Sequence, residues 1–278
     1  MLKKLLKYDT KSIARLIVPL SIAVVVTTIA GTASLRIMRN INTGTNASWI
    51  LTSTLTILFI STILALVAFC IFSEILIMYR YYTNLFTDEG YLTFTLPVKT
   101  SSILKSKVIS AMIWSAYTLL IALFCVFLYV SFGTAEEGLI NTRIFADLKE
   151  TLHLLTVEYS AWTIVKYVVE ILLFFIVSLL YSTLSIYLAL TIGSIIAKKH
   201  KILAAIGIYY AINTVMGIFT MIINSIFAFT NVYRFNYELS IDNVFDIAFF
   251  INVGAFLIFS AASYFITKHF LKNKLNLS

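Results

Sequence analysis

The sequence predicts an all-α, polytopic integral membrane protein with six transmembrane helices. Hydrophobic residues make up 60% of the 278 residues and charged residues only 12%, whereas a soluble domain carries roughly a quarter charged residues. The mean hydropathy is +0.94. Long apolar stretches recur from end to end and leave no room for a separate soluble domain. We therefore expect residues 1–278 to form a single transmembrane domain.

Six apolar segments are long enough to cross a membrane, since a spanning helix needs about 20 mostly apolar residues. The segments are Ile13–Leu35, Leu51–Tyr79, Val108–Phe132, Thr163–Ala197, Ile202–Phe229 and Ile247–Thr267. At ~1.5 Å per residue, the fourth would be ~52 Å long, which exceeds a hydrocarbon core of ~30 Å. We expect this fourth helix to tilt or to project beyond the membrane.

The distribution of Lys and Arg predicts an N-in/C-in orientation, because positive charge is retained on the cytoplasmic side. One set of flanks and loops holds 15 of these residues: Lys3, Lys4, Lys7, Lys11, Arg15, Arg80, Lys99, Lys105, Lys107, Lys198, Lys199, Lys201, Lys268, Lys272 and Lys274. The alternate loops hold 6: Arg36, Arg39, Arg143, Lys149, Lys166 and Arg234. Both termini are therefore expected in the cytoplasm, and residues 133–162 are expected to form an extracellular loop.

The first twelve residues mix apolar and basic side chains. Leucines alternate there with Lys3, Lys4, Lys7 and Lys11, which suits either a basic amphipathic helix on anionic membrane lipids or a merely basic tail. A signal peptide would begin similarly, but the apolar run that follows is long for one. We expect a retained first span.

The sequence contains no motif for catalysis or for nucleotide binding. GxxxxGK[ST], HExxH, GxSxG and CxxC are all absent, and the three histidines are scattered over different loops. Cys70 and Cys125 lie inside apolar runs, where they are expected to pack as small apolar residues. The net charge of +8 comes from short tracts between spans, so nucleic acid is not an expected partner. We expect no enzyme activity, cofactor or metal in this chain.

The second loop, residues 80–107, differs from the others. It is cytoplasmic by the charge distribution, rich in aromatic residues and too polar to span. Gly90 and Pro97 bracket a short segment in which apolar and polar residues alternate. From the residues alone, this loop is either a docking element or an ordinary connector with interfacial tyrosines.

A longer pattern within this loop is the run Glu89-Gly90-Tyr91-Leu92-Thr93-Phe94-Thr95-Leu96-Pro97, which Lys107 and Trp114 follow. The run resembles a cytoplasmic signature of bacterial ATP-binding-cassette (ABC) transporter permeases of the type-2, exporter-like class. The motif covers about thirty residues, and the order of elements is similar over the whole chain. The resemblance implies a permease in the bacterial cytoplasmic membrane, with residues 1–12 as an amphipathic connecting helix.

The same resemblance implies the partners. In that class a permease pairs with a second permease subunit, identical or homologous. Two separate ABC ATPase subunits bind beneath and hold ATP and Mg²⁺. The loop between spans two and three acts as a coupling helix that fits a cleft in the ATPase. The implied contact residues here are Asp88, Glu89, Tyr91, Leu92 and Pro97. Such exporters often carry short extracellular or re-entrant helices before the last span, which would be Met216–Phe245 here.

Polar residues within the apolar segments are further candidates. Glu170 lies about two turns into the fourth segment, where a charge is costly. It would either face a substrate, proton or ion path, or lie at the outer interface beside Lys166, its i−4 neighbour. Asn213 and Asn224 in the fifth segment would hydrogen-bond across helices or line a path.

Small residues recur at four-residue spacing in the fourth segment. Such a ridge lets helices approach closely in lipid, either within the bundle or at a dimer seam. Its members are Ser185, Ala189, Gly193 and Ala197.

Two other classes of function stay open from the sequence. A stand-alone transporter or channel would need several polar residues converging at mid-membrane, and few are present. A non-transporting, peptide-sensing or immunity membrane protein would need no path.

Overall fold

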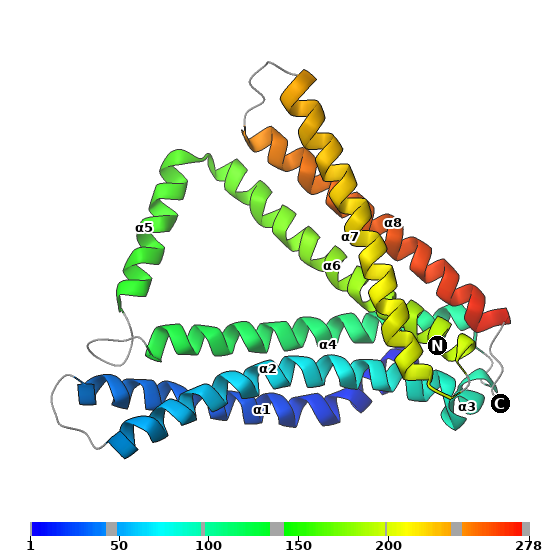
Figure 1. The fold of residues 1–278 in the computed structure, drawn as a ribbon, viewed down its shortest axis with the longest axis horizontal. Coiled ribbons are helices and arrows are strands. Elements are labelled where there is room, and N and C mark those ends of the chain that lie inside the picture. Colours follow the sequence, from blue (N-terminus) through cyan, green and yellow to red (C-terminus); the bar gives the residue numbers. More distant parts are fainter. Residues whose placement is uncertain are drawn as a thin grey trace. The chain divides into compact units, whose positions relative to one another are not determined.

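The structure is a computed structural model that describes residues 2–42, 49–95, 98–133, 142–197, 199–234 and 241–273. Within these ranges the regular elements are all helices (Figure 1). In chain order they are α1 (Leu2–Asn42), α2 (Trp49–Phe86), α3 (Asp88–Thr95), α4 (Thr100–Leu128), the π-helical turn η1 (Tyr129–Gly133), α5 (Thr142–Glu158), α6 (Ala161–Ile196), α7 (Lys201–Arg234) and α8 (Ile241–Asn273).

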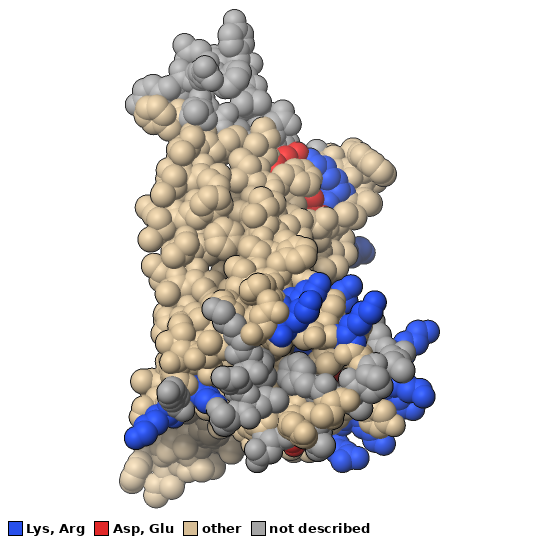
Figure 2. Space-filling model, turned by 90° about the vertical axis from the view of Figure 1, so that its right-hand side faces the viewer, with Lys and Arg blue, Asp and Glu red and all other residues tan. Residues whose placement is uncertain are grey.

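Six of the described helices are long and apolar enough to cross a membrane: α1, α2, α4 with η1, α6, α7 and α8. Their outward faces carry exposed Ile, Leu, Val and Phe side chains along most of their length, which is the surface that lipid would cover. Figure 2 shows large areas without charged side chains, with most of the visible Lys and Arg in the lower half of the view and a smaller group beside acidic residues in the upper half. The all-helical class and the six predicted spans are confirmed, and the chain is a multi-pass membrane protein.

The six helices are longer than the apolar segments that predicted them. They run from 33 residues in α8 to 41 in α1, or ~50–60 Å at ~1.5 Å per residue. Each therefore exceeds a hydrocarbon core of ~30 Å. The fourth span is as long as expected, but it is not exceptional, because α1 and α2 are both longer than the 36 residues of α6. Polar residues at the helix ends continue the helical backbone hydrogen bonding, and a count of apolar residues does not include them.

The chain divides into two compact units, each discontinuous in sequence. The first unit comprises Met1–Leu6, Met78–Met112 and Glu170–Ser278, and the second comprises Lys7–Ile77 and Ile113–Val169. In the first unit the start of α1, helix α3 and the end of α8 lie at one end (Figure 1). We call this the terminal end.

The core of the first unit surrounds one half of α6. Nine consecutive residues, Thr183 through Thr191, are all buried, so neighbouring groups cover every side of the helix there. Just beyond them, Gly193 meets α7 closely: a Cβ at Gly193 would lie 2.6 Å from the Ala205 nitrogen. The half of α6 before Val177 is exposed along its apolar residues.

The second unit is held by polar contacts between its long helices. Ser21 in α1 and Tyr117 in α4 join their hydroxyls at 2.8 Å. Tyr129 in η1 donates a hydrogen bond to Thr62 in α2, and Gly31 of α1 leaves the room these two side chains occupy. Side-chain hydrogen bonds of this kind are common between helices in lipid.

Three predicted segments take their places in these helices. Residues 2–12 form the first turns of α1, continuous with the span. Residues 142–158 of the predicted outer loop form α5, a helix that the sequence analysis did not predict. Residues 216–234 continue α7 and 241–245 begin α8, while 235–240 lie outside the described residues.

Candidate functional site

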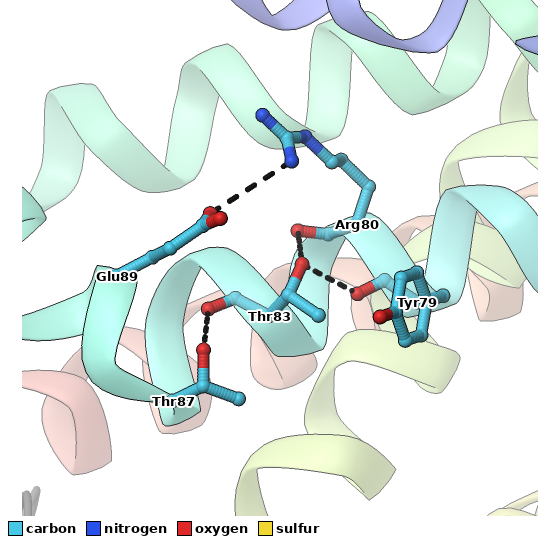
Figure 3. Close-up of polar contacts among 5 residues, drawn as sticks. All are labelled: Tyr79, Arg80, Thr83, Thr87 and Glu89. Atoms are coloured by element: carbon cyan, nitrogen blue, oxygen red, sulfur yellow. Dashed lines mark hydrogen bonds and ion pairs between the residues drawn. The ribbon is translucent and has the colours of Figure 1, made fainter.

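The second loop contains a short helix that turns back on α2. Helix α2 ends at Phe86, where the Thr87 hydroxyl donates to the Thr83 carbonyl oxygen at 2.5 Å. The Gly90 amide then donates to the Thr87 carbonyl at 2.7 Å, which closes a turn and starts α3 at Asp88. This turn directs the Glu89 side chain toward Arg80, which lies earlier in α2 (Figure 3).

Charged and amide groups join α3 to α2 and α4. Glu89 Oε2 lies 3.8 Å from Arg80 Nη1. The orientation of the Asn84 amide that satisfies both neighbours directs its nitrogen to Glu89 Oε2 at 2.6 Å and its oxygen to Lys107 Nζ at 2.5 Å. Lys107 and Asn84 are buried. A buried charge needs a polar partner, and the Asn84 oxygen is that partner for the Lys107 ammonium.

Tyr81 lies at the centre of this region and is fully buried, with 1% of its surface exposed. Its ring stacks on that of Tyr187 in α6, with centroids 3.7 Å apart and planes within 8°. Its hydroxyl shares a 2.9 Å hydrogen bond with Thr191. The Tyr187 hydroxyl donates to the Lys107 carbonyl at 3.3 Å, so α2, α4 and α6 meet around one aromatic pair.

We call Arg80, Tyr81, Asn84, Glu89, Lys107, Tyr187 and Thr191 the α3 mount. Every member belongs to the first unit. The mount provides stacking, hydrogen bonds and one ion pair, and it lies at the terminal end. Its chemistry is suited to holding a helix in place.

The predicted coupling residues take different positions. Tyr91 points outward from α3 with 64% of its surface exposed. The Glu89 side chain is 58% exposed and also pairs with Arg80 as a member of the α3 mount. Asp88 and Leu92 lie in α3, with side chains outside the described set, and Pro97 lies outside the described residues.

The sequence analysis missed Tyr81, Asn84, Tyr187 and Thr191. Tyr81 and Thr191 are separated by 110 residues, and no spacing rule links them. The opposite charges of Arg80 and Glu89 were visible in the sequence. Their pairing depends on the turn at Thr87, which the sequence alone does not specify.

The polar residues within the spans also have defined surroundings. Tyr181 donates to Asn213 Oδ1 at 3.1 Å, and Asn213 Nδ2 donates to its own helix at the Tyr209 carbonyl. Asn224 and Asn252 exchange two hydrogen bonds, at 3.2 and 3.3 Å. These amides join helices α6, α7 and α8, so they have hydrogen-bond partners within the protein and need no ligand.

Glu170 is buried, with 9% of its surface exposed, and one of its carboxylate oxygens has no hydrogen-bond partner. Its i−4 neighbour Lys166 lies with its ammonium 5.4 Å from the centre of the Tyr167 ring. Glu170 is the buried exception among the exposed apolar residues of the first half of α6.

The small-residue ridge follows the enclosed half of α6. Ser185, Ala189 and Gly193 are buried, and Gly193 contacts Ala205 of the same unit. Ala197 directly follows α6, and its amide donates to the Gly193 carbonyl at 3.0 Å. The ridge therefore packs within the bundle at Gly193.

In the described part of the chain, no three His, Cys, Asp or Glu side chains come together as a metal site would require. No family model, curated protein or solved structure matches this chain. Functional inference therefore depends on the residues and contacts described above.

Proposed function

We propose that this chain is the membrane-spanning permease subunit of an ATP-driven ABC exporter. It would form the substrate path together with a second permease subunit, identical or homologous. Two copies of a separate ABC ATPase would bind ATP and Mg²⁺ and would contact α3. The proposal places the chain in a bacterial cytoplasmic membrane, with the terminal end and α3 in the cytoplasm.

The observation that carries the proposal is the mounted helix α3. A flexible connector between two spans would need no buried tyrosine pair beneath it. Here an eight-residue helix is fixed through Glu89 and through the helix ends around Tyr81. It presents Tyr91 outward, and exposed tyrosines are frequent anchors in protein interfaces. A rigid, outward-facing helix can transmit the movement of a bound partner to the spanning helices.

The charge distribution adds support. The predicted second loop, residues 80–107, holds Arg80, Lys99, Lys105 and Lys107, as the positive-inside rule requires of a cytoplasmic segment. The sequence also lacks any nucleotide motif of its own, which agrees with ATP chemistry in a partner.

The test compares two exposed tyrosines in the full-length chain, purified with its partners from native membranes. Tyr91→Ala removes the outward side chain of α3. Tyr210→Ala removes a tyrosine of similar exposure, 69%, from the α7 span. We expect the parent and Tyr210→Ala to retain a co-purifying ATPase. We expect the amount of ATPase that co-purifies with Tyr91→Ala to fall at least tenfold, because loss of a central interface anchor costs ~1.4 kcal/mol or more of binding free energy.

Two results would reject the proposal. The first is the absence of any co-purifying ATPase from the parent chain. The second is equal ATPase recovery and equal ATP-dependent transport into vesicles for Tyr91→Ala and Tyr210→Ala.

A further inference from the structure

Helix α5 is exposed to its surroundings along its described length. All of its described side chains, at 143 and 145–157, are exposed. An amphipathic helix gains most of its stability from covering its apolar face. Some other surface must therefore cover α5.

Four of the large apolar side chains of α5 form one stripe. Phe145, Leu148, Leu152 and Leu155 recur at spacings of three and four residues, as they do on one face of a helix, and all four are exposed. The opposite side carries the charged and polar residues Arg143, Asp147, Glu150 and His153, together with Leu154 and Val157, and Lys149 lies at the edge of the stripe. This division is typical of a helix that lies between water and an apolar phase.

The connection to α6 fixes the level of α5 in the membrane. The last turn of α5 is extended by the Tyr159 amide, which donates to the Leu155 carbonyl at 2.9 Å. Ser160 then caps α6, with its hydroxyl accepting from the Thr163 amide at 3.3 Å. Only two residues separate Glu158 from Ala161, so the end of α5 lies within ~11 Å of the start of a spanning helix.

The start of α6 carries a marker of the membrane surface. Trp162 is exposed in its first turn, and Trp49 is exposed in the first turn of α2. Both helices begin on the membrane face opposite the termini, since successive spans alternate in direction. Tryptophan is enriched at the lipid headgroup level, which is therefore the level at which α5 ends.

The direction of α5 agrees with that level. Within the second unit, α1, α2 and α4 run alongside one another, whereas α5 runs across their direction (Figure 1). Where the first three cross the membrane, a helix that runs across their direction follows its surface.

We infer that α5 is an interfacial helix that binds the lipid surface on the membrane face opposite the termini. Phe145, Leu148, Leu152 and Leu155 enter the acyl-chain boundary, and Lys149, Glu150 and His153 face water. The basic and acidic residues of α5 nearly balance, so the apolar stripe supplies the attraction, and zwitterionic phospholipid suffices. This inference does not depend on the proposed ABC function.

The experiment places a nitroxide spin label on the two sides of α5 in the full-length chain, in a Cys70→Ala/Cys125→Ala background. Leu148→Cys and Leu152→Cys report the apolar stripe, and Glu150→Cys and His153→Cys report the polar side. Each variant is reconstituted into phosphatidylcholine vesicles. Collision rates are measured with oxygen, which concentrates in lipid, and with a water-soluble nickel chelate.

We expect a higher ratio of oxygen to nickel collisions at 148 and 152 than at 150 and 153. Equal ratios at all four positions would overturn the inference, because α5 would then lie in water. Exclusion of both reagents from 148 and 152 would also overturn it, because a second copy or another polypeptide would then cover the stripe. If one label prevents reconstitution, Phe145→Cys and Asp147→Cys provide the same comparison.

Discussion

Tyr81 is held at the residue scale by two kinds of contact, which substitution can separate. Tyr81→Phe removes only the hydroxyl bond to Thr191, whose own hydroxyl also donates to the Tyr187 carbonyl and so keeps a partner. We expect a loss of ~1 kcal/mol of stability. Tyr81→Ala also removes the stacked ring and leaves a cavity, for which we expect ~3–5 kcal/mol. Thermal unfolding of the purified chain in detergent measures both.

The control for this prediction is Tyr79→Phe, because Tyr79 is exposed on the same helix. We expect its unfolding temperature to match that of the parent. A Tyr81→Ala variant as stable as Tyr81→Phe would show that the stack with Tyr187 contributes nothing.

At the scale of the elements, the contact between α6 and α7 depends on a glycine. A Cβ at Gly193 would lie 2.6 and 2.7 Å from the nitrogen and Cα of Ala205, and backbone atoms cannot rotate away as a flexible side chain can. We expect Gly193→Ala to force the helices apart and to cost ~1–3 kcal/mol. Denaturation of the purified chain followed by circular dichroism reports this change.

Gly217 provides the matched control, since a Cβ there would meet nothing within 4 Å. Alanine is the better helix former by ~1 kcal/mol, so Gly217→Ala should be neutral or stabilising. Equal effects of the two substitutions would contradict the close contact at Gly193.

The elements also show how far the sequence could predict this fold. Apolar length predicted the six spans, because a membrane helix must present about 20 apolar residues to lipid. It failed at the helix ends, as at Arg80–Phe86, where polar residues continue α2. Helix α5 was missed although its stripe of Phe145, Leu148, Leu152 and Leu155 was present, because only apolar runs were counted. The stack of Tyr81 on Tyr187 depends on packing between distant helices and has no local pattern.

At the scale of the whole molecule, the six helices and the charge distribution predict a sidedness. A single cysteine at Lys99, exposed between α3 and α4, should lie on the cytoplasmic side. A single cysteine at Glu150 in α5 should lie outside. In the background without Cys70 and Cys125, a membrane-impermeant maleimide added to intact cells should label Glu150→Cys at once and Lys99→Cys only after permeabilisation.

Labelling in the reverse order would invert the orientation and remove the cytoplasmic placement of α3. Labelling of both positions in intact cells would contradict the alternation of the spans between them. The comparison is internal, since both variants carry one cysteine at an exposed site.

The discontinuity of the first unit has a consequence for biosynthesis. Tyr81 leaves the ribosome 110 residues before Thr191, and a ribosome adds ~5–20 residues per second. The first half of the α3 mount therefore waits ~5–20 s for Tyr187 and Thr191, and the ring of Tyr81 lacks its stacking partner until they are made. During this interval the nascent chain would present an unfinished surface to chaperones and proteases, and completion of α6 would end that exposure.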